Sequence, residues 1–193
     1  MKNICVFCGS SLGSDTIFRE SAEELGALIA KHNFRLVYGG GNIGLMGAIA
    51  DSVLDNGGQV IGVIPDFLLK REVGHTNLTE LIITESMHER KLKMAELADA
   101  FIAMPGGYGT LEELAEITTW VQLELMKKPI GVLNVNGFYD HLFEQINYMK
   151  HKGFIGASSN EELIFQSSSS ELLNEIIKRA DDLLNSKTDL FKS

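Results

Sequence analysis

The chain has 193 residues, of which 45% are hydrophobic and 22% are charged, and its formal net charge is −9. This length suits a single domain with a full hydrophobic core. The acidic balance leaves no basic face, so binding to nucleic acid is disfavoured. The sequence holds no uninterrupted apolar run of about 18 residues, and a membrane-spanning helix is therefore not predicted.

The N-terminal stretch indicates a cytoplasmic protein with two structural cysteines. Residues 1–8 hold one positive charge and an apolar run that is too short for a signal peptide. Cys5 and Cys8 form a C-x-x-C within a run that reads as a strand, where positions three apart point to opposite faces. We therefore expect two buried cysteines rather than a redox pair, and a zinc site is not expected.

Short apolar runs alternate with longer helical patterns along the chain. In chain order they predict a strand over 2–8, a helix over 16–32, a strand over 35–38, a helix over 44–56, a strand over 59–64, an irregular segment over 66–77, a strand over 78–84, a helix over 87–97, a strand over 100–104, a helix over 110–125, a strand over 130–134, a helix over 138–152, a strand over 163–165 and a helix over 170–185.

This alternation predicts the fold class and the domain organisation. We expect one doubly wound α/β domain over residues 1–185, with a mostly parallel, Rossmann-like sheet and helices on both of its faces. The strands are apolar throughout, as in sheets that are covered on both sides. Residues 186–193 are expected to form a polar tail. Ligands bind such folds at the carboxyl ends of the strands, which is where the glycine-rich loops should gather.

The first glycine-rich loop resembles a dinucleotide fingerprint but stands in the wrong place. Gly39-x-Gly41-x-x-Gly44 has the right spacing, and Asp66 follows at about the right distance. However, the fingerprint belongs to the first βαβ unit, and this loop follows the second predicted strand. A tight turn that lets a ligand or the backbone approach closely is favoured over NAD binding.

The second glycine-rich loop runs from Pro105 to Thr110 and precedes Glu113. Backbone N–H groups and the dipole of the following helix would hold a phosphate there. The spacing of Thr110-x-x-Glu113 also fits a capping box, so spacing alone leaves Glu113 open as a cap or as a catalytic acid. A cap does not need three glycines, which favours a ligand site. The neighbouring Glu112 and Glu116 are expected to be solvated or structural.

A third element places cations at the same edge of the sheet. Ser86 and Glu89 are spaced to cap the helix over 87–97, and Arg90 and Lys91 follow within its first turns. Adjacent cations are usually a solvated face, but an arginine here could bind a phosphate with two hydrogen bonds. His88 fits a structural hydrogen bond better than an acid.

Taken together, these motifs resemble the LOG (Lonely Guy) family. They are Cys8-Gly9-Ser10, Tyr38-Gly39-Gly40-Gly41-x-x-Gly44-Leu45-Met46-Gly47, Met87-His88-x-Arg90-Lys91 and Pro105-Gly106-Gly107-x-Gly109-Thr110-x-x-Glu113. The likeness continues through Thr119-Trp120, Lys128-Pro129 and Leu133-Asn134-x-x-Gly137-Phe138-Tyr139. Members of the family are cytokinin riboside 5′-monophosphate phosphoribohydrolases, historically labelled possible lysine decarboxylases. In one departure, Glu124-Leu125-Met126 stands where many members have Gly-aliphatic-His.

The resemblance implies a homodimer that needs no metal or redox cofactor and cleaves the N-glycosidic bond of a nucleoside 5′-monophosphate. It implies that Arg90 and Glu113 are the catalytic pair. The substrate-binding residues that it implies are Ser10, Gly41, Glu72, Lys91, Gly106, Gly107, Tyr108, Gly109, Thr110 and Thr119. The alternatives are a non-catalytic carrier of a nucleotide or of molybdenum cofactor, and an NAD(P)-dependent oxidoreductase. Lysine decarboxylation needs a Schiff-base lysine, and none stands out.

Overall fold

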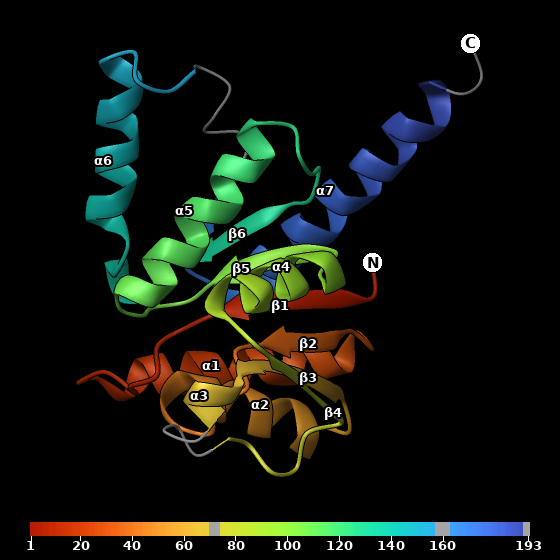
Figure 1. The fold of residues 1–193 in the computed structure, drawn as a ribbon. Helices are drawn as coiled ribbons and strands as arrows, with labels where there is room; N and C mark the ends of the chain where they lie inside the picture. Colours follow the sequence, from red (N-terminus) through yellow and green to blue (C-terminus); the bar gives the residue numbers. More distant parts are fainter. Residues whose placement is uncertain (70–73, 157–162, 191–193) are drawn as a thin grey trace.

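The computed structural model describes residues 1–69, 74–156 and 163–190 and shows one parallel sheet with helices on both faces (Figure 1). Within these residues the sheet has seven strands in the order β4-β3-β2-β1-β5-β6-β7, and every neighbouring pair is parallel. The strands are β1 (Asn3–Phe7), β2 (Arg35–Tyr38), β3 (Gln59–Pro65), β4 (Glu80–Thr84), β5 (Ala100–Ala103), β6 (Ile130–Leu133) and β7 (Leu163–Gln166). The predicted Rossmann-like fold class is confirmed.

The helices follow the strands as the alternation predicts. They are α1 (Thr16–Lys31), α2 (Gly44–Asp55), α3 (Asp66–Leu69), α4 (Met87–Leu97), α5 (Tyr108–Gln122), α6 (Asp140–His151) and α7 (Ser169–Leu190), with a 3₁₀ turn over Val135–Gly137. Side chains of α1, α2 and α7 pack in the core on one face of the sheet. Side chains of α4 and α5 pack in the core on the other face.

The first strand shows how the period of a strand divides these two cores. Ile4, Val6 and Cys8 contribute to one cluster of buried side chains, whereas Cys5 and Phe7 contribute to the other. Both cysteines are buried and free. Burial raises the pKa of both thiols, so neither forms a thiolate readily. The prediction of two structural cysteines on opposite faces is confirmed.

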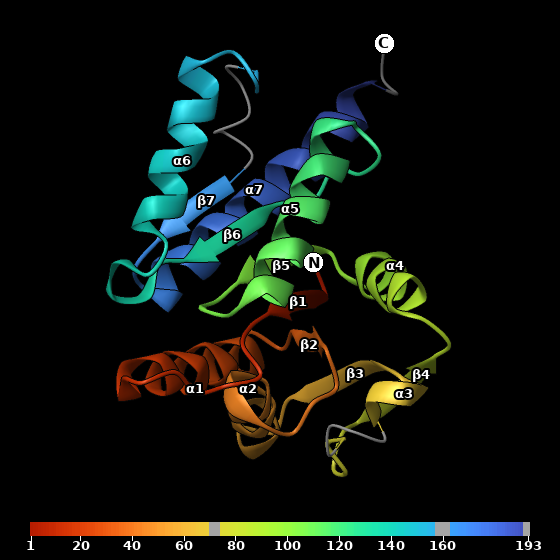
Figure 2. The same ribbon diagram turned by 60° about the vertical axis from the view of Figure 1, so that its left-hand side comes forward.

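The order of the strands creates a switch point between β1 and β5. From β1 the chain builds β2, β3 and β4 on one side, and from β5 it builds β6 and β7 on the other, as Figure 2 shows. Crossovers that diverge in this way leave a crevice at the carboxyl ends of the two central strands. The loops after β1 and β5 meet there, since the N–H of Gly9 donates to the carbonyl of Pro105 at 3.1 Å.

The turn after β2 also approaches this crevice, as the first glycine-rich loop predicts. Gly44 has a φ of +66°, and a Cβ on it would overlap the backbone of Ser10 and Ser11. The backbone N–H of Leu45, in the first turn of α2, donates to the carbonyl of Gly9 at 3.0 Å. Only a residue without a side chain allows both the positive φ and this close contact between backbones, which accounts for a glycine at position 44.

Several boundaries differ from those that the sequence predicts. The segment expected to be irregular contains α3, which is too short to give a periodic signal. Helix α5 begins at Tyr108 and ends at Gln122, and α7 continues to Leu190, beyond the boundary predicted at 185. Strand β4 lies at an edge of the sheet, where Ile83 is 55% exposed, so its apolar residues are not covered on both faces.

Candidate active site

A cavity of about 270 Å³ occupies the switch point. The loop after β1, the first turn of α5 and one face of α4 all contribute to it. Its lining residues are Cys8, Gly9, Ser10, Met46, Leu68, Arg90, Gly107, Tyr108, Gly109, Thr110 and Glu113. The structure thus brings together residues from all four sequence motifs and one further residue, Leu68, that belongs to none of them.

The first turn of α5 offers free backbone N–H groups to the cavity. Gly107 is the N-cap of α5, and no side chain caps this end. The N–H groups of the first helical residues have no partner within a helix, and the helix dipole makes this end positive. Anions bind at such ends, so the phosphate site predicted at Gly106–Thr110 has the geometry that it needs.

Because Gly107 is the N-cap of α5, Thr110 and Glu113 do not form a capping box. The side chain of Thr110 would have to sit at the N-cap to accept a hydrogen bond from the N–H of Glu113. Instead Thr110 is the third residue of α5, two positions after Tyr108, and Glu113 lies in the second turn. The sequence left Glu113 open as a cap or as a catalytic acid, and the structure removes the first role.

Gly106 and Thr110 pack directly against each other. A Cβ on Gly106 would overlap Oγ1 of Thr110, which is 4% exposed. By contrast, a Cβ on Gly107 or Gly109 would have no neighbour within 4 Å. The fold therefore requires a glycine at position 106, whereas the glycines at 107 and 109 leave open space on the cavity side that a ligand could occupy.

Arg90 is held in the cavity by the start of α4. Oγ of Ser86 accepts the N–H of Glu89 at 3.1 Å, which confirms the predicted N-cap. Oε2 of Glu89 accepts from the backbone of Glu85. Arg90 is 9% exposed, and its Nε donates to the carbonyl of Val63 at 3.1 Å. Its Nη1 donates to Sδ of Met87 at 3.8 Å and lies at the same distance from Oε1 of Glu113.

A glycine makes room for this guanidinium. Gly39 lies directly beneath it, and a Cβ there would overlap Nη2 of Arg90. Any side chain at this position would displace the arginine. The glycine turn after β2 therefore supports this cavity although Gly39 does not line it.

Glu113 faces Arg90 from the second turn of α5. Its Oε1 lies 3.8 Å from Nη1 of Arg90, and each side chain is 11% exposed. Burial raises the pKa of Glu113 from 4.5 to about 7, because desolvation outweighs the attraction of Arg90. A carboxyl with a pKa near neutrality can exchange a proton with substrate or water at physiological pH.

Other residues implied by the resemblance lie outside the cavity lining. The Lys91 ammonium donates to Glu112 at 2.5 Å and to Glu116 at 3.0 Å, and these bonds raise its pKa. Thr119 donates to the carbonyl of Ala115 and lines a separate groove between α5 and α6.

Gly41 and Gly106 do not line the cavity either. Gly41 forms an antiparallel bridge with Gly74. Glu72 lies outside the residues that the structure describes.

Four lining residues were not among the predicted site residues. Cys8 and Gly9 belong to a quoted motif, and their position directly after β1 was the signal that pointed to this edge. Met46 lies in the first turn of α2, next to the glycine turn. Leu68 lies on α3 and had no sequence signal, because the segment gave no periodic pattern.

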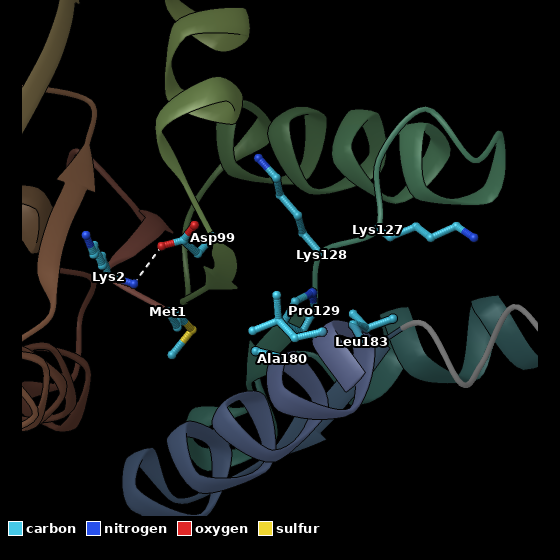
Figure 3. A pocket seen from close by; sticks show the side chains of 9 residues that line it. Met1, Lys2, Asp99, Lys127, Lys128, Pro129, Ala180 and Leu183 are labelled. Carbon is cyan, nitrogen blue, oxygen red and sulfur yellow. Dashed lines mark hydrogen bonds between the residues drawn. The ribbon is translucent and has the colours of Figure 1, made fainter. Parts of the chain in front are cut away.

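A second cavity, of about 340 Å³, lies at the opposite edge of the sheet (Figure 3). There Oδ2 of Asp99 accepts the backbone N–H of Lys2, and Lys128 Nζ donates to the carbonyl of Ala95. Lys127 extends away from them, as Figure 3 shows. The polar groups of Asp99 and Lys128 thus serve the fold, and the cavity contains no acid–base pair comparable to Arg90 and Glu113.

Two features of the described part of the chain bear on other functions. No group of three or more His, Cys, Asp or Glu side chains in these residues could hold a metal ion. Among the same residues, none of the helices has both the length and the apolar character needed to cross a membrane.

Comparison with known proteins decides the family. The model of a family described as "Possible lysine decarboxylase" matches residues 46–176. The chain is 46% identical over 175 residues to the cytokinin riboside 5′-monophosphate phosphoribohydrolase LOG1 of Arabidopsis thaliana, covering 91% of this chain and 82% of that protein. It is 48% identical over 172 residues to the LOG enzyme of Oryza sativa subsp. japonica, covering 89% and 71%. The chain belongs to the LOG family.

Solved structures similar to this LOG chain share its fold. The molybdenum cofactor binding protein of Rippkaea orientalis superposes with a TM-score of 0.67 at 25% identity, covering 92% of this chain and 96% of that protein. The molybdenum cofactor carrier protein of Chlamydomonas reinhardtii superposes with a TM-score of 0.70 at 19% identity, covering 94% and 98%. The second likeness concerns the fold alone.

Proposed function

We propose that this protein hydrolyses the N-glycosidic bond of nucleoside 5′-monophosphates and releases the free base and ribose 5-phosphate. The observation that carries the proposal is the buried pair of Arg90 and Glu113, which faces the anion-binding start of α5 within one cavity. The names of the relatives, which are cytokinin riboside 5′-monophosphate phosphoribohydrolases, support the same reaction.

The geometry suits a reaction in which the phosphate positions the sugar. The N–H groups at the start of α5 would hold the 5′-phosphate, and the Arg90 guanidinium would bind the phosphoribosyl group. Such binding provides orientation, so a nucleoside without the phosphate should react poorly. Glu113 lies one helical turn beyond this end of α5, which is where the ribose of a bound nucleotide would extend.

The carboxylate of Glu113 performs the chemistry in this proposal. Cleavage of a glycosidic bond passes through an oxocarbenium-like state, whose positive charge a nearby carboxylate stabilises. Glu113 accepts a proton from water as the water oxygen bonds to C1′. The bond between C1′ and the base nitrogen breaks, and the base leaves with its bonding electron pair and takes up a proton from solvent, while Glu113 returns its proton to solvent. A pKa of about 7 leaves Glu113 able to act as the base.

The test is release of base from two nucleotides. The protein is incubated with AMP and with isopentenyladenosine 5′-monophosphate, and chromatography measures the free base and ribose 5-phosphate. We expect equal amounts of the two products from at least one substrate, and far less base from adenosine than from AMP. A folded protein that releases base from neither nucleotide would disprove the proposal.

A carrier function is the second candidate, since one similar structure, at 25% identity, is named as a molybdenum cofactor binding protein. A carrier needs the phosphate-binding end of α5 but has no need of a carboxyl with a pKa of about 7 beside a buried arginine. Tight binding of an intact nucleotide without cleavage would favour this candidate. Lysine decarboxylation is not proposed, because the cavity lining includes no lysine and the Lys91 ammonium is bound by Glu112 and Glu116.

The proposal includes a homodimer formed through the groove between α5 and α6. This groove has a volume of about 350 Å³ and is lined mainly by apolar side chains, among them Leu114, Leu142, Ile146 and Met149. Helix α6 has no buried residue and stands away from α5 in both Figures 1 and 2. A second copy docked here would cover apolar surface and would contact Thr119, which lies in the groove.

Light scattering after size-exclusion chromatography tests the dimer. Ile146→Glu places a charge in the groove and should yield monomers. Ile83→Glu is the matched control, because Ile83 is 55% exposed on β4 and lies outside the groove. A monomeric wild-type protein, or an Ile146→Glu variant that stays dimeric, would contradict this part of the proposal.

The remaining binding residues and the location stay predictions. Ser10, Gly107, Tyr108, Gly109 and Thr110 line the cavity, which supports their proposed contacts with substrate. The proposed roles of Lys91, Gly41 and Glu72 in substrate binding, and the cytoplasmic location, remain expectations from the sequence.

A further inference from the structure

A buried histidine outside the catalytic cavity joins α2 to the segment that follows α3. His75 is 5% exposed, and its Nε2 lies 2.9 Å from Oδ1 of Asp51 on α2. Its Nδ1 accepts a hydrogen bond from the backbone N–H of Asn77 at 3.2 Å. Because Nδ1 is an acceptor, the ring proton is on Nε2, which donates it to the carboxylate of Asp51.

The backbone at His75 is also tied to the glycine turn that follows β2. The N–H of His75 donates to the carbonyl of Gly40 at 3.2 Å. Gly39, the previous residue of the same turn, lies directly beneath the guanidinium of Arg90. The segment that contains His75 therefore stabilises the glycine turn that packs against Arg90.

The same segment reaches a wall of the cavity through α3. Gly74 forms an antiparallel bridge with Gly41, and a Cβ on Gly74 would overlap Cδ1 of Leu69. Leu68, the neighbour of Leu69 on α3, lines the catalytic cavity. A helix as short as α3 has little stability of its own, so its position depends on contacts such as these.

We propose that His75 and Asp51 form a latch that positions two parts of the catalytic cavity, namely the wall at Leu68 and the turn beneath Arg90. Both are positioning residues, since neither lines the cavity. The side chain of Asp51 is 61% exposed, so its removal disturbs little of the core. Removal of the Asp51 carboxylate leaves the buried Nε2–H group of His75 without an acceptor, which favours opening of the segment that contains His75.

Asp51→Ala tests the latch, and Asp55→Ala is the matched control, because Asp55 is an exposed carboxylate on the same helix. We expect Asp51→Ala to raise KM for AMP about five- to tenfold while kcat changes less than about twofold. Asp55→Ala should leave KM within about twofold of the wild-type value. The kinetic readout rests on the proposed function, whereas the next measurement does not.

Hydrogen exchange follows the latch without any reaction. In Asp51→Ala the backbone amides of residues 39–41, 66–69 and 74–77 should exchange about tenfold faster, while those of α1, α5 and α7 stay unchanged. Asp55→Ala should show the exchange pattern of the wild type.

Two substitutions of His75 test whether the hydrogen bond to Asp51 is the part of the side chain that matters. His75→Asn keeps an acceptor for the N–H of Asn77 but cannot reach Asp51, whereas His75→Gln can donate to Asp51. We expect His75→Asn to resemble Asp51→Ala and His75→Gln to restore part of the wild-type KM. The double variant Asp51→Ala/His75→Asn should be no worse than either single variant, since both remove the same bond.

The outcomes separate the latch from other roles. The proposal is overturned if Asp51→Ala matches Asp55→Ala in KM and in exchange. It is equally overturned if Asp51→Ala speeds exchange uniformly and lowers Tm, because the pair would then be a general stabiliser. Failure of the proposed function looks different: the wild type would release no base, and the exchange of residues 66–69 and 74–77 would still decide the fate of the latch.

Discussion

Nη1 of Arg90 lies 3.8 Å from Oε1 of Glu113, close enough for an ion pair and too far for a strong hydrogen bond. Each side chain is held by its own helix, Arg90 by α4 and Glu113 by α5. The attraction of Arg90 lowers the pKa of Glu113, but burial raises it more, and the result is about 7. The pair thus combines a permanent cation with a carboxyl that titrates near neutrality.

The first prediction concerns the pH dependence of catalysis. Glu113 must lose its proton to accept one from water, and its pKa is raised to about 7. We therefore expect kcat/KM to fall tenfold for each pH unit below about pH 7, as for a single ionisation. Initial rates of base release across the pH range measure this profile. A profile that stays flat through neutrality would contradict the role of Glu113 as a base.

The second prediction concerns stability. The folded-state pKa of Glu113, about 7, is raised above its ordinary value of 4.5, so the native state binds more protons than the unfolded state between these values. Its contribution to stability is present at low pH and is lost as pH rises through this window. Glu113→Gln cannot ionise and avoids the loss. Relative to wild type, it should gain on the order of 2–3 kcal/mol between about pH 5 and about pH 8.

Urea denaturation of both proteins at the two pH values checks this prediction. Glu112→Gln serves as a control, because Glu112 has a side chain that is 55% exposed. If the difference between Glu113→Gln and wild type is the same at both pH values, Glu113 does not titrate in the expected window.

The third prediction separates two glycines of the same loop. Gly106→Ala would push against Thr110 and should destabilise the protein by about 1–3 kcal/mol. Gly109→Ala meets no neighbour within 4 Å and lies inside α5, so the fold should tolerate it. Its methyl group would instead occupy space that the phosphate needs, and KM for AMP should rise. Thermal denaturation and initial rates of both variants measure these effects. Equal losses of stability in the two variants would contradict the claim that the fold requires a glycine at position 106 but not at position 109.

The sequence allowed the fold, and the edge of the sheet that holds the candidate site, to be predicted for physical reasons. A strand that is buried on both sides reads as an unbroken apolar run, as at Ile4 to Phe7, and alternation with helices leaves few topologies. The carboxyl ends of parallel strands meet at one edge, so the sequence alone predicts that the glycine loops after β1 and β5 lie together.

The parts of the site that could not be predicted depend on where a helix starts, or on which way a side chain points, to within one helical turn. Thr110 has the spacing of an N-cap, but Gly107 is the N-cap of α5. Only the backbone angles show which of the two residues precedes the helix. Lys91 follows Arg90 directly, yet one turns to the cavity and the other to Glu112 and Glu116, because neighbours on a helix point in different directions. Leu68 reaches the cavity from a helix too short to give a pattern.

The most direct test of the central claim compares Glu113→Gln with Glu112→Gln. The two variants make the same chemical change at adjacent positions, and only Glu113 lines the cavity. With AMP at saturation, Glu113→Gln should lose turnover on the order of a hundredfold or more, while Glu112→Gln should stay within about threefold of the wild type. A folded Glu113→Gln variant that releases base at the rate of the wild type would contradict the claim that Glu113 performs the chemistry.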